Sequence, residues 1–402
     1  MRRVELLHGM QIAATLKKLK DLMDSIRILC IGGARPNFMK LAPLFRAFGE
    51  FPEISASLVH TGQHYDDQMS GQFFRELGLP SPLYNLEVGS ASHAQQTAEI
   101  MKRFEPVLLR EQPTAVLVVG DVNSTAACTL VAKKLNVPVI HVEAGLRSFD
   151  RSMPEEINRL VTDAIADLLL VTEESGIGNL EREGVESGKI VFVGNLMIDS
   201  LYFQMERSRA SRIADELGVA ERRFGLVTLH RPSNVDDSAQ LQQISSALEE
   251  ISRQDDLPLI FPVHPRTRSR LGEARNDRIK LLEPLGYNDF VALMMRATLV
   301  FTDSGGVQEE TTALGIPCLT LRSNTERPIT VEQGTNRLAG TSYESIVSAW
   351  KDLKRNPPLG KVPPLWDGKA AFRCIEAIRN AFSSSKHISH DEASLNTAAH
   401  KP

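Results

Sequence analysis

The 402-residue chain is predicted to be an α/β protein of two Rossmann-like domains, and three features predict this. Short, nearly continuous apolar runs alternate with helical stretches, which is typical of parallel strands covered on both faces. The alternation breaks at a helical segment rich in Arg, Ser and Glu and then starts again, so we expect two halves joined near residues 196–222. The chain is also long enough to bury two cores.

Six runs in the first half have strand character: 27–33, 54–62, 115–121, 137–143, 167–173 and 189–195. Helices are expected between several of them, for example around PLFRAF and STAACTLVAKKL. Five further runs follow in the second half: 224–230, 257–264, 278–284, 297–303 and 316–322. Ligands of open α/β sheets bind beyond the carboxyl ends of the strands, so the cleft between the two halves is the expected site.

These patterns divide the chain into four expected parts. They are a leader with a short amphipathic helix (1–25), an N-terminal Rossmann-like domain (26–195), a C-terminal Rossmann-like domain (196–382) and a polar, disordered tail (383–402).

The overall composition indicates a soluble globular protein. A net charge of −4 and a pI of about 6.2 give no electrostatic preference for nucleic acid or for an anionic membrane. No apolar run reaches membrane-spanning length. The four cysteines are far apart and lack metal-ligand or disulfide spacing, so we expect them to be buried in a reducing cytoplasm.

The stretch 298–310, TLVFTDSGGVQEE, is the most informative motif. An apolar strand runs into Ser304, Gly305 and Gly306, and a helical stretch follows, which is the arrangement that presents free backbone N–H groups to an anion. The two glycines are expected to take positive φ. Carboxylates in the first helical turn, at Glu309 and Glu310, would repel a phosphate but suit ribose hydroxyls. The motif therefore predicts a nucleotide site.

A second glycine turn follows the first strand. Gly32-Gly33 leads to Arg35-Pro36, and Pro36 suits the first position of a helix. Arg35 and Lys40 would then lie near the helix start, where a diphosphate is favoured. The alternative is a tight connection with a solvated arginine.

Three carboxylates stand where predicted strands end or a helix begins. Asp121 closes one strand, although it could serve only as a helix cap. Glu143 closes the next strand, and a structural ion pair with Arg147 is the competing explanation. Glu155 and Glu156 follow Pro154, where carboxylates usually only complement the helix dipole.

Imidazole and guanidinium groups occupy similar positions in the second half. His230 and His264 each close an apolar strand, and either could be a hydrogen-bonded core histidine. Arg327 is a candidate phosphate clamp. No spacing of His and carboxylates suggests a metal. The set suits proton transfer and leaving-group binding on a nucleotide-linked substrate.

Eight motifs, in one order, resemble those of the non-hydrolysing UDP-N-acetylglucosamine 2-epimerases between about residues 27 and 381. They are GARPNFMK, GDVNST, HVEAGLRS, MPEEINR, TLHRPSN, PVHPRT, TDSGGVQEE and NTERP. The resemblance implies a glycosyltransferase-B-like fold, a UDP-sugar in the interdomain cleft, a cytoplasmic homodimer, and neither cofactor nor metal. It also implies a reaction in which the proton at sugar carbon 2 is removed, UDP leaves to give a 2-acetamidoglucal, and UDP adds back with reprotonation on the other face.

By motif, the resemblance makes Asp121, Glu143 and Glu155 the acid/base carboxylates and His230 the group that assists departure of UDP. The expected substrate-binding residues are Arg35, Lys40, His264, Phe290, Ser304, Gly305, Gly306, Glu310 and Arg327. Asn37 and Asp66 depart from the better-known bacterial pattern; the segment that contains Asp66 is linked to an allosteric substrate site in the family.

Three other functions remain open at this point. A glycosyltransferase can share the fold and the ribose-binding glutamate, and it would need an acceptor. A hydrolysing epimerase would release free N-acetylmannosamine. A binding protein with an inactive site is disfavoured by the intact set Asp121, Glu143, Glu155 and His230.

Overall fold

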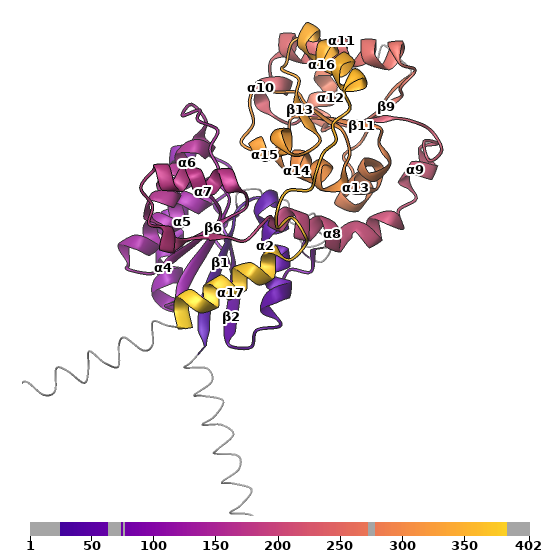
Figure 1. The fold of residues 1–402 in the computed structure, drawn as a ribbon. Coiled ribbons are helices and arrows are strands. Elements are labelled where there is room, and N and C mark those ends of the chain that lie inside the picture. Colours follow the sequence, from indigo (N-terminus) through magenta and orange to yellow (C-terminus); the bar gives the residue numbers. More distant parts are fainter. Residues whose placement is uncertain (1–24, 63–73, 75–76, 272–277, 384–402) are drawn as a thin grey trace, which may run out of the picture.

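The computed structural model describes residues 25–62, 74, 77–271 and 278–383, and these form two α/β domains (Figure 1). Each domain is built on one parallel sheet, which confirms the predicted fold class. The predicted leader helix, the predicted disordered tail and Asp66 lie outside the described residues, apart from Ser25 and Ser383. The predicted domain boundaries stay a prediction.

The N-terminal sheet has seven strands, in the spatial order β3 (Tyr84–Asn85), β2 (Ile54–His60), β1 (Ile26–Gly32), β4 (Ala115–Val119), β5 (Val139–Ala144), β6 (Leu168–Val171) and β7 (Ile190–Phe192). The helices between them are α2 (Arg35–Phe48), α4 (His93–Glu111), α5 (Asn123–Lys134), α6 (Pro154–Ile165), α7 (Glu174–Arg182) and the one-turn η1 (Ser187–Lys189).

The C-terminal sheet has six strands, in the order β10 (Ile279–Leu282), β9 (Leu259–Pro262), β8 (Gly225–Thr228), β11 (Leu299–Thr302), β12 (Cys318–Thr320) and β13 (Asn336–Leu338). The helices of this half are α8 (Leu196–Arg209), α9 (Ile213–Glu216), α10 (Pro232–Val235), α11 (Ser238–Gln254), α12 (Pro265–Leu271), α13 (Tyr287–Arg296), α14 (Gly305–Leu314), α15 (Pro328–Glu332), α16 (Tyr343–Arg355) and α17 (Ala370–Ser383).

Both sheets have the doubly wound order in which the chain starts in the middle, winds to one edge, and then returns to fill the other. The order reverses between β1 and β4 in the first sheet and between β8 and β11 in the second. Loops on either side of such a reversal diverge and leave a crevice at the carboxyl ends of the strands. The two glycine turns, Asp121, Glu143 and His230 follow these four strands or lie at the end of their neighbour β5, whereas His264 follows β9.

The predicted strands formed because their apolar runs are buried on both faces, as in β4, where every residue is buried. Strands β3 and β13 were not predicted. Each is two or three residues long, lies at an edge of its sheet and contains an asparagine, so neither has an apolar run to detect. The four cysteines are free and buried, as expected.

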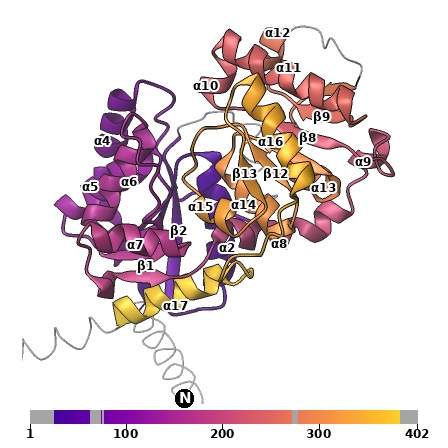
Figure 2. The same cartoon turned by 45° about the horizontal axis from the view of Figure 1, so that its top comes forward.

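Two helices tie the domains together. Along α8, Leu196 and Met197 pack in the core of the N-terminal domain, whereas Ile198 and Leu201 pack in a core of the C-terminal domain. The last helix, α17, returns to the first sheet, and its residues join that core (Figures 1 and 2). The two domains are therefore held together by the packing of α8 as well as by the polar contacts described below.

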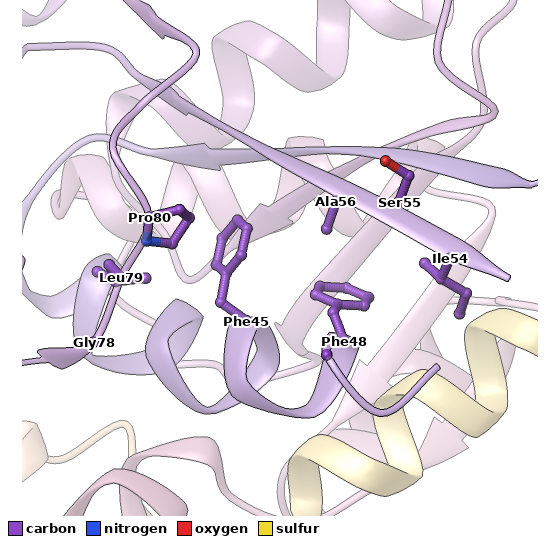
Figure 3. A pocket seen from close by; sticks show the side chains of 9 residues that line it. Phe45, Phe48, Ile54, Ser55, Ala56, Gly78, Leu79 and Pro80 are labelled. Carbon is purple, nitrogen blue, oxygen red and sulfur yellow. The ribbon is translucent and has the colours of Figure 1, made fainter. Parts of the chain in front are cut away.

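A surface hollow of about 530 Å³ lies against the C-terminal end of α2 and is lined by Phe45, Phe48, Ile54, Leu79 and Pro80, among others (Figure 3). A helix of this length spans about 20 Å, so the hollow is remote from Arg35 at the other end of α2. Within the described residues, no helix has the length and apolarity to cross a lipid bilayer.

Candidate active site

The turn after β1 is held against the end of β4 by Asn37. Its Oδ1 atom accepts the N–H groups of Gly33 (3.2 Å) and Ala34 (3.0 Å), and its Nδ2 donates to the carbonyl of Val119 (2.9 Å). The amide thus bridges the two strands at the point where their order reverses. A carboxylate at this position could accept the two N–H groups but could not donate to Val119.

Glu143 is the most constrained carboxylate of the site. It lies in β5 at a register shift and has φ of +71°, a left-handed conformation that is uncommon for a residue with a side chain. Its Oε2 lies 2.6 Å from Nζ of Lys40, and its Oε1 lies 3.0 Å from Nη2 of Arg327. Burial alone would raise the pKa of Glu143, but these two cations outweigh it and hold the pKa well below its ordinary value.

The competing explanation for Glu143, an ion pair with Arg147, was wrong. Arg147 turns away and pairs with Asp163 (2.7 Å) and Glu183 (2.6 Å). Glu143 is therefore paired with the two residues, Lys40 and Arg327, that the sequence indicated as phosphate ligands.

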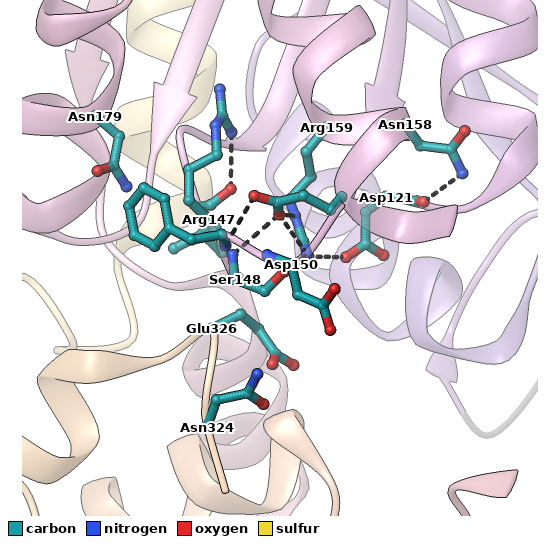
Figure 4. A network of polar contacts seen from close by, with 12 residues as sticks. Asp121, Arg147, Ser148, Asp150, Asn158, Arg159, Asn179, Asn324 and Glu326 are labelled. Atoms are coloured by element: carbon teal, nitrogen blue, oxygen red, sulfur yellow. Dashed lines mark hydrogen bonds and ion pairs between the residues drawn. The ribbon is translucent and has the colours of Figure 1, made fainter. Parts of the chain in front are cut away.

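Asp121 follows β4 and pairs with Arg159 of α6, whose Nη1 lies 2.5 Å from Oδ2 (Figure 4). Asp121 does not cap α5, because the N-cap position belongs to Val122. Burial raises the pKa of Asp121 although Arg159 opposes the shift, and the charge of Glu143 adds to it. The side chain is still 28% exposed, so it combines a crowded, charged setting with access from outside.

Glu155 and Glu156 both lie in the first turn of α6 but differ in their contacts. Glu156 is buried and accepts the N–H groups of Ser148 and Phe149 (3.0 Å each) and a hydrogen bond from Arg159 (2.9 Å). Glu155 is half-buried and makes no hydrogen bond or ion pair with any described residue. Glu156 thus holds the loop, and Glu155 is available to a ligand.

His230 is anchored from behind by Asp303. Nδ1 of His230 lies 2.8 Å from Oδ1 of the buried carboxylate, and the side chain is 59% exposed. Asp303 also accepts the backbone N–H groups of His230 (3.1 Å) and Arg231 (3.0 Å). Burial would raise the pKa of Asp303, but its hydrogen bond with His230 lowers it. The ionised carboxylate fixes the ring and leaves Nε2 directed away from Asp303.

The second glycine motif forms the start of α14, with Ser304 at the N-cap position. The predicted positive φ was wrong for both glycines, because Gly305 and Gly306 are the first two residues of the helix. Space is limited at position 305, since a Cβ there would lie 2.8 Å from Oε1 of Glu326. Ser304 makes no capping hydrogen bond, so the first N–H groups of α14 have no side-chain cap.

The two glutamates of this motif lie in the second turn of α14, not in the first as expected, and both are buried. Oε1 of Glu310 accepts a hydrogen bond from the Tyr287 hydroxyl (2.7 Å), and burial raises the pKa of Glu310 to about 7. Oε1 of Glu309 lies 2.6 Å from Nε of Arg327 and accepts a hydrogen bond from Asn195 (2.9 Å). The motif thus contains one carboxylate that holds Arg327 and another that is free to change its protonation state.

The three remaining predicted substrate-binding residues lie at or near the starts of helices. Arg35 is exposed at the first position of α2, and its charge lowers the otherwise raised pKa of Tyr287, so the two are near one another. Phe290 is half-buried on α13, one turn from Tyr287 and hence on the same face. His264 is exposed just before α12.

Several residues of the site were missed from the sequence. They are Asp303, Arg159 and Tyr287, together with Glu173, a fully buried carboxylate after β6 whose pKa burial raises to about 7. Asp303 ends a strand and could have been found by the reasoning applied to Asp121. Arg159 lies in the MPEEINR motif but inside a helix, and Tyr287 begins one; neither ends a strand, so the strand-end reasoning did not select them. Within the described ranges, no group of three or more His, Cys, Asp or Glu residues could hold a metal.

Comparison with known proteins adds to this geometry. A family model described as UDP-N-acetylglucosamine 2-epimerase matches residues 46–379. A relative of that name from Methanocaldococcus jannaschii is 43% identical over 363 residues, covering 88% of this chain and 99% of the relative. A UDP-2,3-diacetamido-2,3-dideoxy-D-glucuronate 2-epimerase from Pseudomonas aeruginosa is 44% identical over 330 residues, covering 81% and 91%. The crystal structure of the M. jannaschii enzyme with UDP-GlcNAc and UDP has a TM-score of 0.81 over 88% of this chain and 99% of its own.

Proposed function

Because the chain belongs to the UDP-N-acetylglucosamine 2-epimerase family and so epimerises a UDP-2-acetamido sugar, we propose that it interconverts UDP-N-acetylglucosamine and UDP-N-acetylmannosamine. The observation that supports this most is the position of Glu143, a strained and buried carboxylate of one domain that pairs with Arg327 of the other. Glu143 also pairs with Lys40, and its negative charge raises the pKa of Asp121.

Nucleotide binding is proposed to involve both domains. Lys40, Arg327 and the first N–H groups of α14 supply positive charge for a diphosphate. Nη1 of Arg327 is buried and has no hydrogen-bond partner among the described residues, which supports its role as a ligand of the substrate. Glu310 has the acceptor oxygens that ribose hydroxyls need, and Phe290 is close enough along α13 to pack near the uracil.

The proton at carbon 2 is weakly acidic, so the reaction needs a base whose pKa changes with substrate binding. A diphosphate next to Lys40 and Arg327 would compete with Glu143 for both cations and raise the pKa of its carboxylate toward the useful range. Asp121 and Glu155 are the proposed acids that protonate carbon 2 on the opposite face of the sugar when UDP adds back.

Departure of UDP is proposed to depend on His230. The ring is exposed and held by Asp303, so its second nitrogen can reach a phosphate oxygen and stabilise the charge that develops there. Asp303 fixes the ring orientation through its contact with Nδ1.

A second substrate remains a candidate, because the P. aeruginosa enzyme that acts on a 2,3-diacetamido uronic acid is as similar as the M. jannaschii enzyme. A homodimer in the cytoplasm is also proposed. Light scattering of the purified protein would test the dimer.

One experiment tests the activity and separates the alternatives. The protein is incubated with UDP-N-acetylglucosamine in D₂O without an acceptor and followed by NMR. Deuterium at carbon 2 together with the manno nucleotide sugar is expected. An unlabelled donor would indicate a transferase, and free N-acetylmannosamine would indicate a hydrolysing epimerase. The uronic acid substrate is tested in a parallel sample.

A further inference from the structure

Four buried or partly buried ionisable side chains form a continuous network next to the strand ends that carry the proposed acid/base residues. His141 of β5 and Asp163 of α6 are fully inaccessible, and Nδ1 of His141 lies 2.6 Å from Oδ1 of Asp163. The other Asp163 oxygen lies 2.7 Å from Nη1 of Arg147, which in turn pairs with Glu183 at 2.6 Å. Acids and bases therefore alternate along the network.

Both ring nitrogens of His141 face hydrogen-bond acceptors. Nδ1 faces Asp163, and Nε2 lies 2.9 Å from the carbonyl oxygen of Gly120. A neutral imidazole has a single N–H and would leave one contact without a proton. Burial would raise the pKa of Asp163, but His141 and Arg147 lower it, so this carboxylate is ionised. An imidazolium gives the network two cations and two anions, the balance that a buried site requires.

The network holds the two turns that direct Asp121 and Glu143. The Gly120 carbonyl, which accepts from the ring, belongs to the residue just before Asp121, and Gly120 has φ of +67°. The same Asp163 oxygen that binds Arg147 also accepts the N–H of Gly145 (3.0 Å), two residues after Glu143. Both strand ends are thus fixed by one network, and a displacement of about 1 Å in a catalytic group can cost about 100-fold in rate.

We propose that His141 is a positioning residue for the epimerisation: as an imidazolium held by Asp163, it fixes the Gly120 carbonyl and thereby the carboxylate of Asp121. The proposal rests on the proposed function, in which Asp121 acts on the sugar. The ring is fully buried and does not touch the substrate. Its loss should therefore lower kcat and leave KM and the binding of UDP nearly unchanged.

Two substitutions of His141 separate catalysis from folding. Asparagine places its amide nitrogen near the position of Nδ1, so His141→Asn keeps the Asp163 contact and loses the one to Gly120. Glutamine reaches toward the position of Nε2, so His141→Gln keeps the Gly120 contact. We expect kcat to fall about 100-fold in His141→Asn and only about tenfold in His141→Gln, with KM within about twofold in both.

A control variant accounts for loss of stability alone. Ser252 of α11 is a buried residue of the C-terminal domain whose hydroxyl donates to the Leu257 carbonyl (2.7 Å). Ser252→Ala should lower the melting temperature and keep the wild-type kcat. ¹⁵N NMR of the wild-type protein at neutral pH should show protons on both nitrogens of His141, a result that does not depend on any variant folding.

The outcomes are distinct. A wild-type kcat in His141→Asn, a lower kcat in His141→Gln than in His141→Asn, or a single ring proton on His141 would each overturn the positioning role. If the wild-type protein itself introduced no deuterium at carbon 2, the proposed function would fail instead.

Discussion

The guanidinium of Arg327 joins the two domains through Glu143, with 3.0 Å between Nη2 and Oε1. On its other side, Nε lies 2.6 Å from Oε1 of Glu309, and all three side chains are buried. Removing one member of such a group leaves an uncompensated buried charge. The contact between the domains and the charge on the proposed base therefore depend on the same arginine.

Arg327→Gln should lower both stability and activity. Loss of the shared cation leaves Glu143 and Glu309 close together, so we expect the free energy of unfolding to fall by about 3–5 kcal/mol. Because the variant would also lack the proposed ligand of the diphosphate, deuterium incorporation at carbon 2 should slow by more than about 100-fold. Urea unfolding and NMR in D₂O measure the two effects.

A matched control is Arg337→Gln. Arg337 pairs with Asp352 at the surface, where both side chains are partly exposed. Such pairs contribute up to about 1 kcal/mol, so stability and rate should stay near wild type. Equal effects of the two substitutions would contradict the role given to Arg327.

Glu310 should make stability depend on pH. Burial raises its pKa from 4.5 to about 7, so the native protein binds this proton more tightly than the unfolded chain does. Its contribution is fully favourable below about pH 4.5 and is lost as the pH rises through about 7. Glu310→Gln removes this loss. The variant should therefore gain stability relative to wild type between pH 4.5 and 8, by at most about 3 kcal/mol.

Urea unfolding at several pH values tests this, because the other titrating groups are common to both proteins. Uridine, which carries no phosphate, is a suitable binding probe. Its affinity for the wild type should rise with pH through about 7, since in the proposed binding mode the ionised carboxylate accepts hydrogen bonds from both ribose hydroxyls. Parallel stability profiles for the two proteins would refute the assignment.

Gly305 and Gly306 should differ in their tolerance of alanine. A Cβ at position 305 would lie 2.8 Å from Oε1 of Glu326. The Glu326 carboxylate is held in place by Arg322, 2.7 Å from Oε2, and by Arg231, 3.2 Å from Oε1. At position 306 the nearest atom is Cε of Met197, at 3.5 Å. Gly305→Ala should weaken UDP binding by about 1–3 kcal/mol through overpacking, and Gly306→Ala should change it little. Calorimetric titration with UDP measures the affinity of both variants. Similar losses of affinity in the two would show that space at position 305 is not the constraint.

The fold could be predicted because parallel strands buried on both faces leave long apolar runs in the sequence. Strand β4 is such a run. Strand β13 lies at the edge of its sheet and pairs with one neighbour only, and its sequence, Asn-Arg-Leu, contains no apolar run. The glycines show the opposite limit. A glycine indicates either positive φ or lack of space, and only the side chain of Glu326, 21 residues later, shows that space is the reason at Gly305.

The site could be predicted where a residue ends a strand, because strand ends of a doubly wound sheet meet at one edge. That reasoning selected Asp121, Glu143 and His230 as candidates, and their catalytic roles stay a prediction. It could not pair Glu143 with Arg327, because the contact joins residues 184 positions apart. Arg147 was the competing candidate because it is close in sequence, but in space it pairs with Asp163 and Glu183.

Glu155 and Glu156 provide the most direct test of the catalytic assignment, because two adjacent glutamates have opposite environments. Glu155→Gln changes a side chain without a hydrogen bond or ion pair to the described residues, so stability should stay within about 0.5 kcal/mol of wild type. If Glu155 transfers the proton, the rate of deuterium incorporation should fall by about 100-fold or more. Glu156→Gln weakens the contacts to Ser148, Phe149 and Arg159 and should cost about 1–3 kcal/mol of stability. NMR in D₂O and urea unfolding on both variants separate the two roles. Retained exchange in Glu155→Gln, with loss in Glu156→Gln, would transfer the catalytic role to the second glutamate.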